Sequence, residues 1–248
     1  MRSILTLLGA LLLGLGLWQG LVMVTGVPRF ILPGPILVAE TIWTSRALIA
    51  EHAIVTFAEV LLGLCLGGIL GAATAILLAA SALMRAMLQP ILVFTQAVPV
   101  FALAPVLTLW LGYGLWPKIA MTLLIIYFPV ASAFLDALLR TPQGFLDMAR
   151  VMGARPERVL LRIRIPAALP GLASGLRLAA VYAPIGAIIG EWVGASRGLG
   201  YLMLLASGRA KTDLMFAALI MLALFTILLH KAVDWTAQRV LDSPDSTA

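Results

Sequence analysis

The sequence has 248 residues, of which 62% are hydrophobic and only 11% are charged, and its formal net charge is +6. A soluble domain carries about 25% charged residues, and a chain of this length folded in water would still expose much of its surface. The composition therefore excludes an ordinary soluble protein. It predicts an all-α, polytopic membrane protein that forms one transmembrane domain over residues 1–248. The positive charge is then expected in loops that face the cytoplasm, and no nucleic-acid partner is predicted.

Six apolar stretches are long enough to be membrane spans, since a helix needs about 20 such residues to cross a bilayer core. The first stretch has the apolar character of a signal peptide, but no small-x-small cleavage site follows it, so an uncleaved span is favoured. After it, Pro33 and Pro35 preclude a regular helix, and residues 36–53 are amphipathic enough to lie along the outer interface. The tail, residues 241–248, is expected to be disordered. The predicted spans are 4–26, 56–80, 88–111, 118–139, 169–190 and 214–233.

Basic residues orient the chain, because they are enriched in cytoplasmic loops. If the N-terminus is cytoplasmic, ten lysine and arginine residues fall inside and six fall outside. Six of the inside ten lie in one loop, residues 140–168, so this loop and both termini are predicted to be cytoplasmic. The inside residues are Arg2, Arg85, Arg140, Arg150, Arg155, Arg158, Arg162, Arg164, Lys231 and Arg239. The outside residues are Arg29, Arg46, Lys118, Arg197, Arg209 and Lys211.

The loop carries a dense polar island, "FLDMARVMGARPERVLLRIRIP", in an otherwise apolar chain. A helical pattern begins near Phe145, and Gly153 can end it in a left-handed conformation. Pro156 suits the first position of a second helix, and Pro166 is expected to end that helix before the next span. The pattern predicts a helix–turn–helix elbow on the cytoplasmic surface. On length and charge alone, a basic, solvated loop that only fixes topology remains an alternative.

The spacing within the elbow resembles the EAA motif in the membrane subunits of bacterial ABC importers. That motif reads Glu-Ala-Ala, three residues, Gly, nine residues, Ile-x-Leu-Pro. Met148 departs from its first alanine, and aspartate and isoleucine replace its glutamate and leucine. The resemblance implies a coupling helix that docks on a separate cytoplasmic ATPase and transmits nucleotide-driven closure to the spans. The residues that it assigns to this coupling are Asp147, Met148, Ala149, Gly153, Ile163 and Pro166.

The ATPase itself is not expected in this chain. A phosphate-binding loop requires G-x-x-x-x-G-K-[ST], and the nearest string, residues 206–212, has Ala210 where the second glycine is needed. ATP and magnesium are therefore expected on the partner, so this chain is predicted to be a transport subunit without a cofactor, not an enzyme. Because such an importer works with two ATPases and this chain has one elbow, the resemblance implies a homodimer. It also implies a periplasmic or surface substrate-binding protein and a place in the bacterial inner membrane.

Two further segments extend the resemblance over roughly residues 30–240. The stretch "VPVFALAPVLTLWLGYGLWPKI" (98–119) looks like the third span of the nitrate/sulfonate/taurine branch, and "GEWVGASRGLGYLM" (190–203) looks like its segment after span five. The sequence of residues 190–219 looks more like the corresponding segment of permeases for pyrimidine precursors of thiamine than like that of the sulfonate permeases. The implied cargo is a hydroxymethylpyrimidine-type molecule, with an aliphatic sulfonate, taurine or nitrate as the alternative.

An integral-membrane enzyme is the competing class of function. Such an enzyme should gather histidine, aspartate or cysteine near one membrane face. His52 and His230 lie far apart without neighbouring ligands, so no metal site is predicted. The single Cys65 is read as a small core hydrophobe.

Ionisable or helix-breaking residues inside spans are the candidates for the translocation path, because a charge in mid-membrane costs about 2.5–3.5 kcal/mol. An interfacial position is favoured for Asp136 and Arg177, the only basic residue expected deep in the membrane, whereas path and interface are both open for Glu59 and Glu191. Gln96, Pro99 and Pro105 are expected to interrupt the third span, and Gly198 and Gly200 suit a re-entrant turn. A carboxylate accepts hydrogen bonds from an aminopyrimidine, and Trp192 offers a face for stacking. The path candidates are Glu59, Gln96, Pro99, Glu191, Trp192, Gly198 and Gly200.

Overall fold

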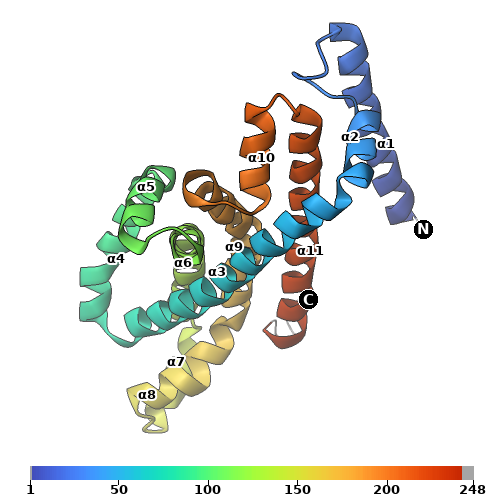
Figure 1. Ribbon diagram of the computed structural model, residues 1–248. Coiled ribbons are helices and arrows are strands. Elements are labelled where there is room, and N and C mark those ends of the chain that lie inside the picture. Colours follow the sequence, from blue (N-terminus) through green and yellow to red (C-terminus); the bar gives the residue numbers. More distant parts are fainter. Residues whose placement is uncertain (1, 242–248) are drawn as a thin grey trace.

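A computed structural model describes residues 2–241, and every regular element in this part of the chain is a helix (Figure 1). The predicted all-α fold is therefore confirmed, while most of the tail expected to be disordered, residues 242–248, lies outside the described residues. The elements are α1 (Arg2–Thr25), α2 (Pro35–Thr44), α3 (Arg46–Ala80), α4 (Ala82–Ala97), α5 (Val100–Leu111), α6 (Leu115–Leu139), α7 (Gln143–Val151), α8 (Pro156–Val159), the π-helix η1 (Leu160–Arg164), α9 (Ile165–Gly194), α10 (Leu199–Gly208) and α11 (Thr212–Val240).

Four helices of the described chain are long and apolar enough to cross a membrane, or five if the bent pair α4 and α5 counts as one span. The predicted second, fourth, fifth and sixth spans lie within these long helices. The predicted first span lies on α1, whose described apolar stretch, Leu12–Thr25, is shorter than the others. The predicted third span corresponds to the bent pair.

The centre of the fold is the packing of α9 along α6, the most extensive contact between any two helices. Small residues allow this close approach, as is common where membrane helices meet. A Cβ placed on Gly186 of α9 would lie 2.5 Å from the Cα of Thr122, and one on Gly175 would lie 3.0 Å from the Cα of Val130. Helix α3 packs on both α6 and α9. These three helices carry the polar residues described below.

The third predicted span is broken, as expected, but at one point only. Helices α4 and α5 meet at an angle of 99°, and Pro99 caps the start of α5 in an extended conformation. Pro105 lies inside α5, and Gln96 lies in the last turn of α4, so neither interrupts a helix. The break at Pro99 follows from its missing N–H and from the extended backbone favoured by the residue before a proline.

The elbow forms between α6 and α9 and projects beyond them (yellow in Figure 1). Gly153 adopts the predicted left-handed conformation, with φ +68°. Its N–H donates to Arg150 O at 2.9 Å, and the N–H of Ala154 donates to Ala149 O at 3.0 Å. These two bonds are those of a Schellman turn, which satisfies the last carbonyls of α7.

The prediction that Pro166 ends the second elbow helix is wrong. That helix begins at Pro156, as predicted, but continues through α8, η1 and α9 as one helix of 39 residues to Gly194. The N–H of Ile165 donates to Leu160 O, five residues back. This wider turn accommodates the missing N–H and the ring of Pro166, which would otherwise disrupt a regular helix.

Residues 36–53, expected to be an amphipathic segment, do not form one element. Helix α2 ends at Thr44, and the residues from Arg46 onward are the first turns of α3. The segment is drawn inward because Val38 and Ile49 are buried in a cluster with α10 and α11. Thr41 Oγ1 also donates to Asp213 Oδ2 at 2.9 Å, which ties α2 to the start of α11.

Candidate functional site

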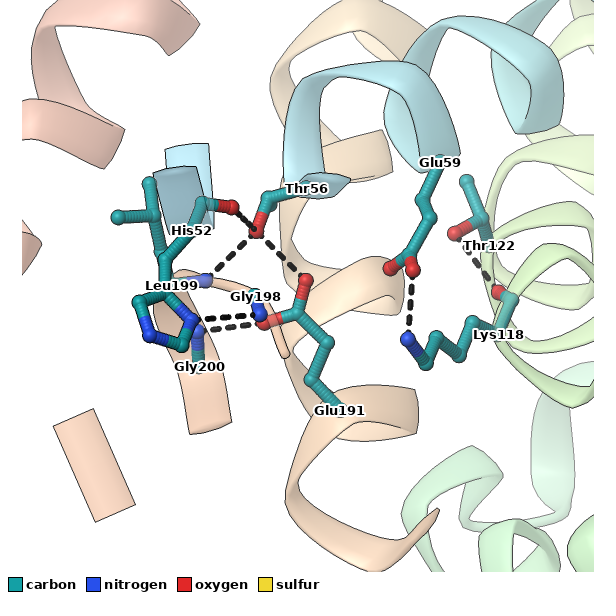
Figure 2. A network of polar contacts seen from close by, with 9 residues as sticks. All are labelled: His52, Thr56, Glu59, Lys118, Thr122, Glu191, Gly198, Leu199 and Gly200. Atoms are coloured by element: carbon teal, nitrogen blue, oxygen red, sulfur yellow. Dashed lines mark hydrogen bonds and ion pairs between the residues drawn. The ribbon is translucent and has the colours of Figure 1, made fainter. Parts of the chain in front are cut away.

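A buried polar layer joins α3, α6, α9 and the start of α10 (Figure 2). Helix α3 contributes His52, Thr56 and Glu59, which share one face at helical spacings of four and three residues. Lys118 of α6 and Glu191 of α9 complete the layer, and all five side chains are buried. Buried polar groups are costly unless they are paired, so the partners of each group decide what it can do.

Glu191 and two residues of α3 cap the N-terminus of α10. The first N–H groups of a helix lack partners within the helix. Here Gly198 N–H donates to His52 Nδ1 at 3.0 Å, Leu199 N–H donates to Thr56 Oγ1 at 2.7 Å, and Gly200 N–H donates to Glu191 Oε2 at 2.5 Å. These three bonds fix α10 against both α3 and α9.

The other oxygen of Glu191 is also engaged. Thr56 donates its hydroxyl proton to Glu191 Oε1 at 2.6 Å. Gly198 has φ +121°, and a Cβ at this position would overlap the Glu191 carboxyl group. Gly198 and Gly200, predicted to form a re-entrant turn at the outer mouth, therefore let the backbone approach the carboxylate and start α10.

Glu59 forms the second half of the layer with Lys118. Lys118 Nζ lies 2.6 Å from Glu59 Oε1, and the two side chains are 7% and 1% exposed. Glu59 Oε2 has no hydrogen-bond partner among the described residues. Lys118, counted above with the outer segments, lies in the first turn of α6, which begins at Leu115.

A cavity of about 680 Å³ opens next to this ion pair. Its walls come from α3, the turn before α6, and the end of α9 with the following turn. The cavity is lined by Val55, Glu59, Tyr113, Gly114, Leu115, Lys118, Val193, Gly194, Ala195, Ser196 and Arg197. Its volume lies within the range of about 300–1,000 Å³ that is typical of small-molecule sites.

The remaining path candidates do not join this site. Gln96 and Pro99 are exposed at the junction of α4 and α5. Trp192 is 52% exposed and does not line the cavity, so it offers no stacking face there. Tyr113 does line it, on the turn between Gly112 and Gly114, and was missed by the sequence reasoning.

Two other ionisable candidates lie away from the cavity. Asp136 is exposed near the C-terminal end of α6, next to the elbow. Arg177 Nε lies 2.6 Å from Asp234 Oδ1 of α11, and both side chains are partly exposed. Arg177 thus pairs with a neighbouring helix, and this pair fastens α11 to α9. No cluster of potential metal ligands occurs among residues 2–241.

The elbow presents an exposed face with both charged and apolar side chains. Asp147 Oδ1 pairs with Arg150 at 2.7 Å on the surface of α7. Met148, Val151 and Met152 are 56%, 90% and 76% exposed. Exposed apolar groups of this kind mark interaction surfaces, which suits the predicted docking of a partner.

The other predicted coupling residues differ in their accessibility. Gly153 and Pro166 are exposed, and Ile163 is half-buried. Ala149 is 3% exposed, so it packs inside the chain and cannot form the surface contact that was predicted for it. Its small side chain supports the elbow from within.

Comparison with known families decides the class of this protein. The family described as binding-protein-dependent transport system inner membrane component matches residues 63–242, which is most of the chain. The chain belongs to this family. It is therefore the multi-pass permease subunit of an ABC importer, and ATP hydrolysis belongs to a separate partner.

Three relatives cover nearly the whole permease. A probable ABC transporter permease protein of Haemophilus influenzae is 48% identical and covers 96% of this chain and 96% of its own. The formylaminopyrimidine transport permease protein ThiX of Halalkalibacterium halodurans is 36% identical, and the match covers 88% of this chain and 87% of ThiX. The riboflavin transport system permease protein RibX of Chloroflexus aurantiacus is 37% identical, and the match covers 89% of this chain and 83% of RibX.

A solved structure shares the fold. A chain of the MetNI methionine ABC transporter in an inward-facing conformation aligns with a TM-score of 0.70 and covers 80% of this permease and 99% of its own length. The sequences are 22% identical, so this likeness concerns the fold alone.

Proposed function

We propose that this permease imports a thiamine-precursor pyrimidine. The relative that carries formylaminopyrimidine is 36% identical across most of both chains. The ion pair of Glu59 and Lys118 supports a cargo without net charge, because the carboxylate and the ammonium group compensate each other at the buried end of the cavity. Riboflavin is the second candidate, since RibX is equally similar, and an aliphatic sulfonate remains the anionic alternative.

Growth on limiting precursor tests the cargo. A strain that cannot make the pyrimidine half of thiamine is supplied with low external hydroxymethylpyrimidine. Deletion of this permease should raise the concentration needed for growth, and a plasmid copy should restore it. Unchanged growth, together with a higher riboflavin requirement in a riboflavin auxotroph, would favour the second candidate. Loss of growth on a sulfonate as sulfur source would favour the anionic one.

The permease is expected to work as a homodimer with two cytoplasmic ATPase subunits and a substrate-binding protein. One elbow per chain supports this stoichiometry, because each elbow serves one ATPase. A twofold axis is the usual symmetry for two identical subunits. The exposed apolar side chains Met148, Val151 and Met152 on the elbow supply the surface for the ATPase.

Both termini are proposed to face the cytoplasm. The positively charged loop of residues 140–168 supports this orientation. A reporter that is active only in the periplasm, fused after Ala248, should give no signal, whereas the same reporter fused within the turn after Ser196 should give one. The opposite pattern would place the elbow outside, where no ATPase reaches it.

A further inference from the structure

We infer that the cavity beside Glu59 and Lys118 is a binding subsite for the planar, nitrogen-containing ring of the cargo. This inference rests on the proposed function, because it assigns the proposed cargo class to a place in the permease. It goes further by naming the groups that recognise the ring.

The floor of the cavity offers a hydrogen-bond acceptor and a donor side by side. Glu59 Oε1 and Lys118 Nζ lie 2.6 Å apart, and Glu59 Oε2 is buried without a partner among the described residues. A carboxylate only accepts hydrogen bonds, and an ammonium group only donates them. An aminopyrimidine edge has the complementary pair, an amino donor next to a ring-nitrogen acceptor. An isoalloxazine edge also places an imide N–H next to a carbonyl.

The rim of the cavity offers a stacking surface. Tyr113 lines the cavity and is 85% exposed, so its ring is not committed to the core. It lies between Gly112 and Gly114, which have φ +76° and +130°. These conformations, which glycine adopts readily, form the turn that carries Tyr113 next to the start of α6. The face of a planar ring in the cavity would stack on Tyr113, and its edge would form hydrogen bonds with the polar floor.

Arg197 is the feature that would favour an anion instead. It also lines the cavity, but it is exposed at the rim, where solvent and salt weaken its field. At the buried floor, the charge of Lys118 is already balanced by Glu59. An acceptor-only sulfonate would leave Glu59 Oε2 without a hydrogen-bond donor, so the floor favours the ring.

Glu191 provides an internal contrast to Glu59. Both are buried carboxylates in one polar layer, but both oxygens of Glu191 are occupied by Thr56 and Gly200, and Glu191 does not line the cavity. Glu59 is therefore assigned to recognition of the ring, and Glu191 to holding α10 in place.

The test is equilibrium binding to the purified permease–ATPase complex in nanodiscs without the substrate-binding protein. The probes are labelled 4-amino-5-hydroxymethyl-2-methylpyrimidine, riboflavin and taurine. Glu59→Gln turns the free acceptor into a donor at constant size and should weaken ring binding by about ten- to a hundredfold. Tyr113→Ala should weaken it by about two- to tenfold, and Tyr113→Phe should keep it.

Three controls separate recognition from stability. Glu51→Gln changes an exposed carboxylate on the same helix and should leave the dissociation constant unchanged. Glu191→Gln should lower the thermal midpoint of the complex without changing the dissociation constant of the folded fraction. Arg197→Gln, at the exposed rim of the cavity, should weaken taurine binding more than ring binding, because a ring without net charge gains little from the guanidinium group. Because Tyr113 is exposed, its variants test the subsite even where Glu59→Gln fails to assemble.

The outcomes distinguish this inference from the proposed function. Ring binding that is unchanged in both Glu59→Gln and Tyr113→Ala overturns the subsite, even if cells import the pyrimidine. Binding of riboflavin alone, weakened by the same variants, supports the subsite and moves the cargo to the second candidate. Binding of taurine alone, abolished by Arg197→Gln, overturns the subsite, and the growth experiment then decides the cargo separately.

Discussion

Replacing Gly153 with valine should abolish transport while the chain still inserts into the membrane. Gly153 ends α7 with φ +68°, and a β-branched residue is a steric outlier in this region. The left-handed conformation costs an L-residue about 1–2 kcal/mol, and the strain falls on the elbow that is proposed to dock on the ATPase. Uptake into proteoliposomes and stimulation of ATP hydrolysis by the loaded binding protein should both fall to background.

The matched control is Gly144→Val. Gly144 lies in the first turn of α7 with open space around its Cβ position, and its φ is not positive. This variant should keep transport within about twofold, since it places the same side chain on the same helix at a small cost in helix propensity. Normal transport by Gly153→Val would refute the role of the elbow, and loss of membrane insertion would show that the strain reaches the whole fold.

Gly186→Ala should destabilise the fold strongly, although it adds only a single methyl group. The new Cβ would lie 2.5 Å from the Cα of Thr122 and 2.9 Å from its backbone nitrogen. Backbone atoms cannot rotate away as a side chain can, so α9 must separate from α6 along their main contact. Overpacking of this kind costs about 1–3 kcal/mol. The thermal midpoint in detergent should fall by roughly 5–10 °C, with less protein recovered from the membrane.

Gly68→Ala is the matched control for this variant. Gly68 lies within α3, and its added Cβ would meet only Leu176 Cδ2, at 3.1 Å. The flexible end of a leucine can shift, so the midpoint should stay within about 2 °C of the parent. Equal losses in the two variants would mean that the contact of α9 with α6 does not set the effect, because alanine is the better helix former at both positions.

The local features of the elbow could be predicted from the sequence because their causes are local. The left-handed turn depends on Gly153 itself, and the start of α8 depends on Pro156. The helix end predicted at Pro166 is wrong because a proline ends a regular helix but can be accommodated in a π-helical turn. The residue types in the sequence do not indicate where such a turn forms. Pro99 breaks the third predicted span, as expected, because a proline lacks a backbone N–H and favours an extended conformation in the residue before it. This cause is also local.

The polar layer was only partly predictable because its partners are far apart in sequence. Glu59 and Glu191 stand out as carboxylates in apolar stretches. The partner that neutralises Lys118 lies 59 residues earlier, and only the packing of α3 on α6 brings the two together. The spacing of His52, Thr56 and Glu59 on one helical face was the available signal for this layer. Trp192 does not reach the cavity because its neighbour Glu191 faces inward, which turns the next residue of the helix outward.

The uninterrupted run from Pro156 to Gly194 makes the elbow and the outer end of α9 parts of one lever. At about 1.5 Å per residue, its 39 residues span roughly 55–60 Å. Bending concentrates where the hydrogen-bond ladder is interrupted, which means η1, Pro170 and Pro184 in this helix. A tilt applied at the elbow therefore reaches Glu191 through three joints, and Glu191 passes it to α10 through the bond from Gly200. The tilt that arrives at Glu191 would depend on the stiffness of these joints as much as on the force applied at the elbow.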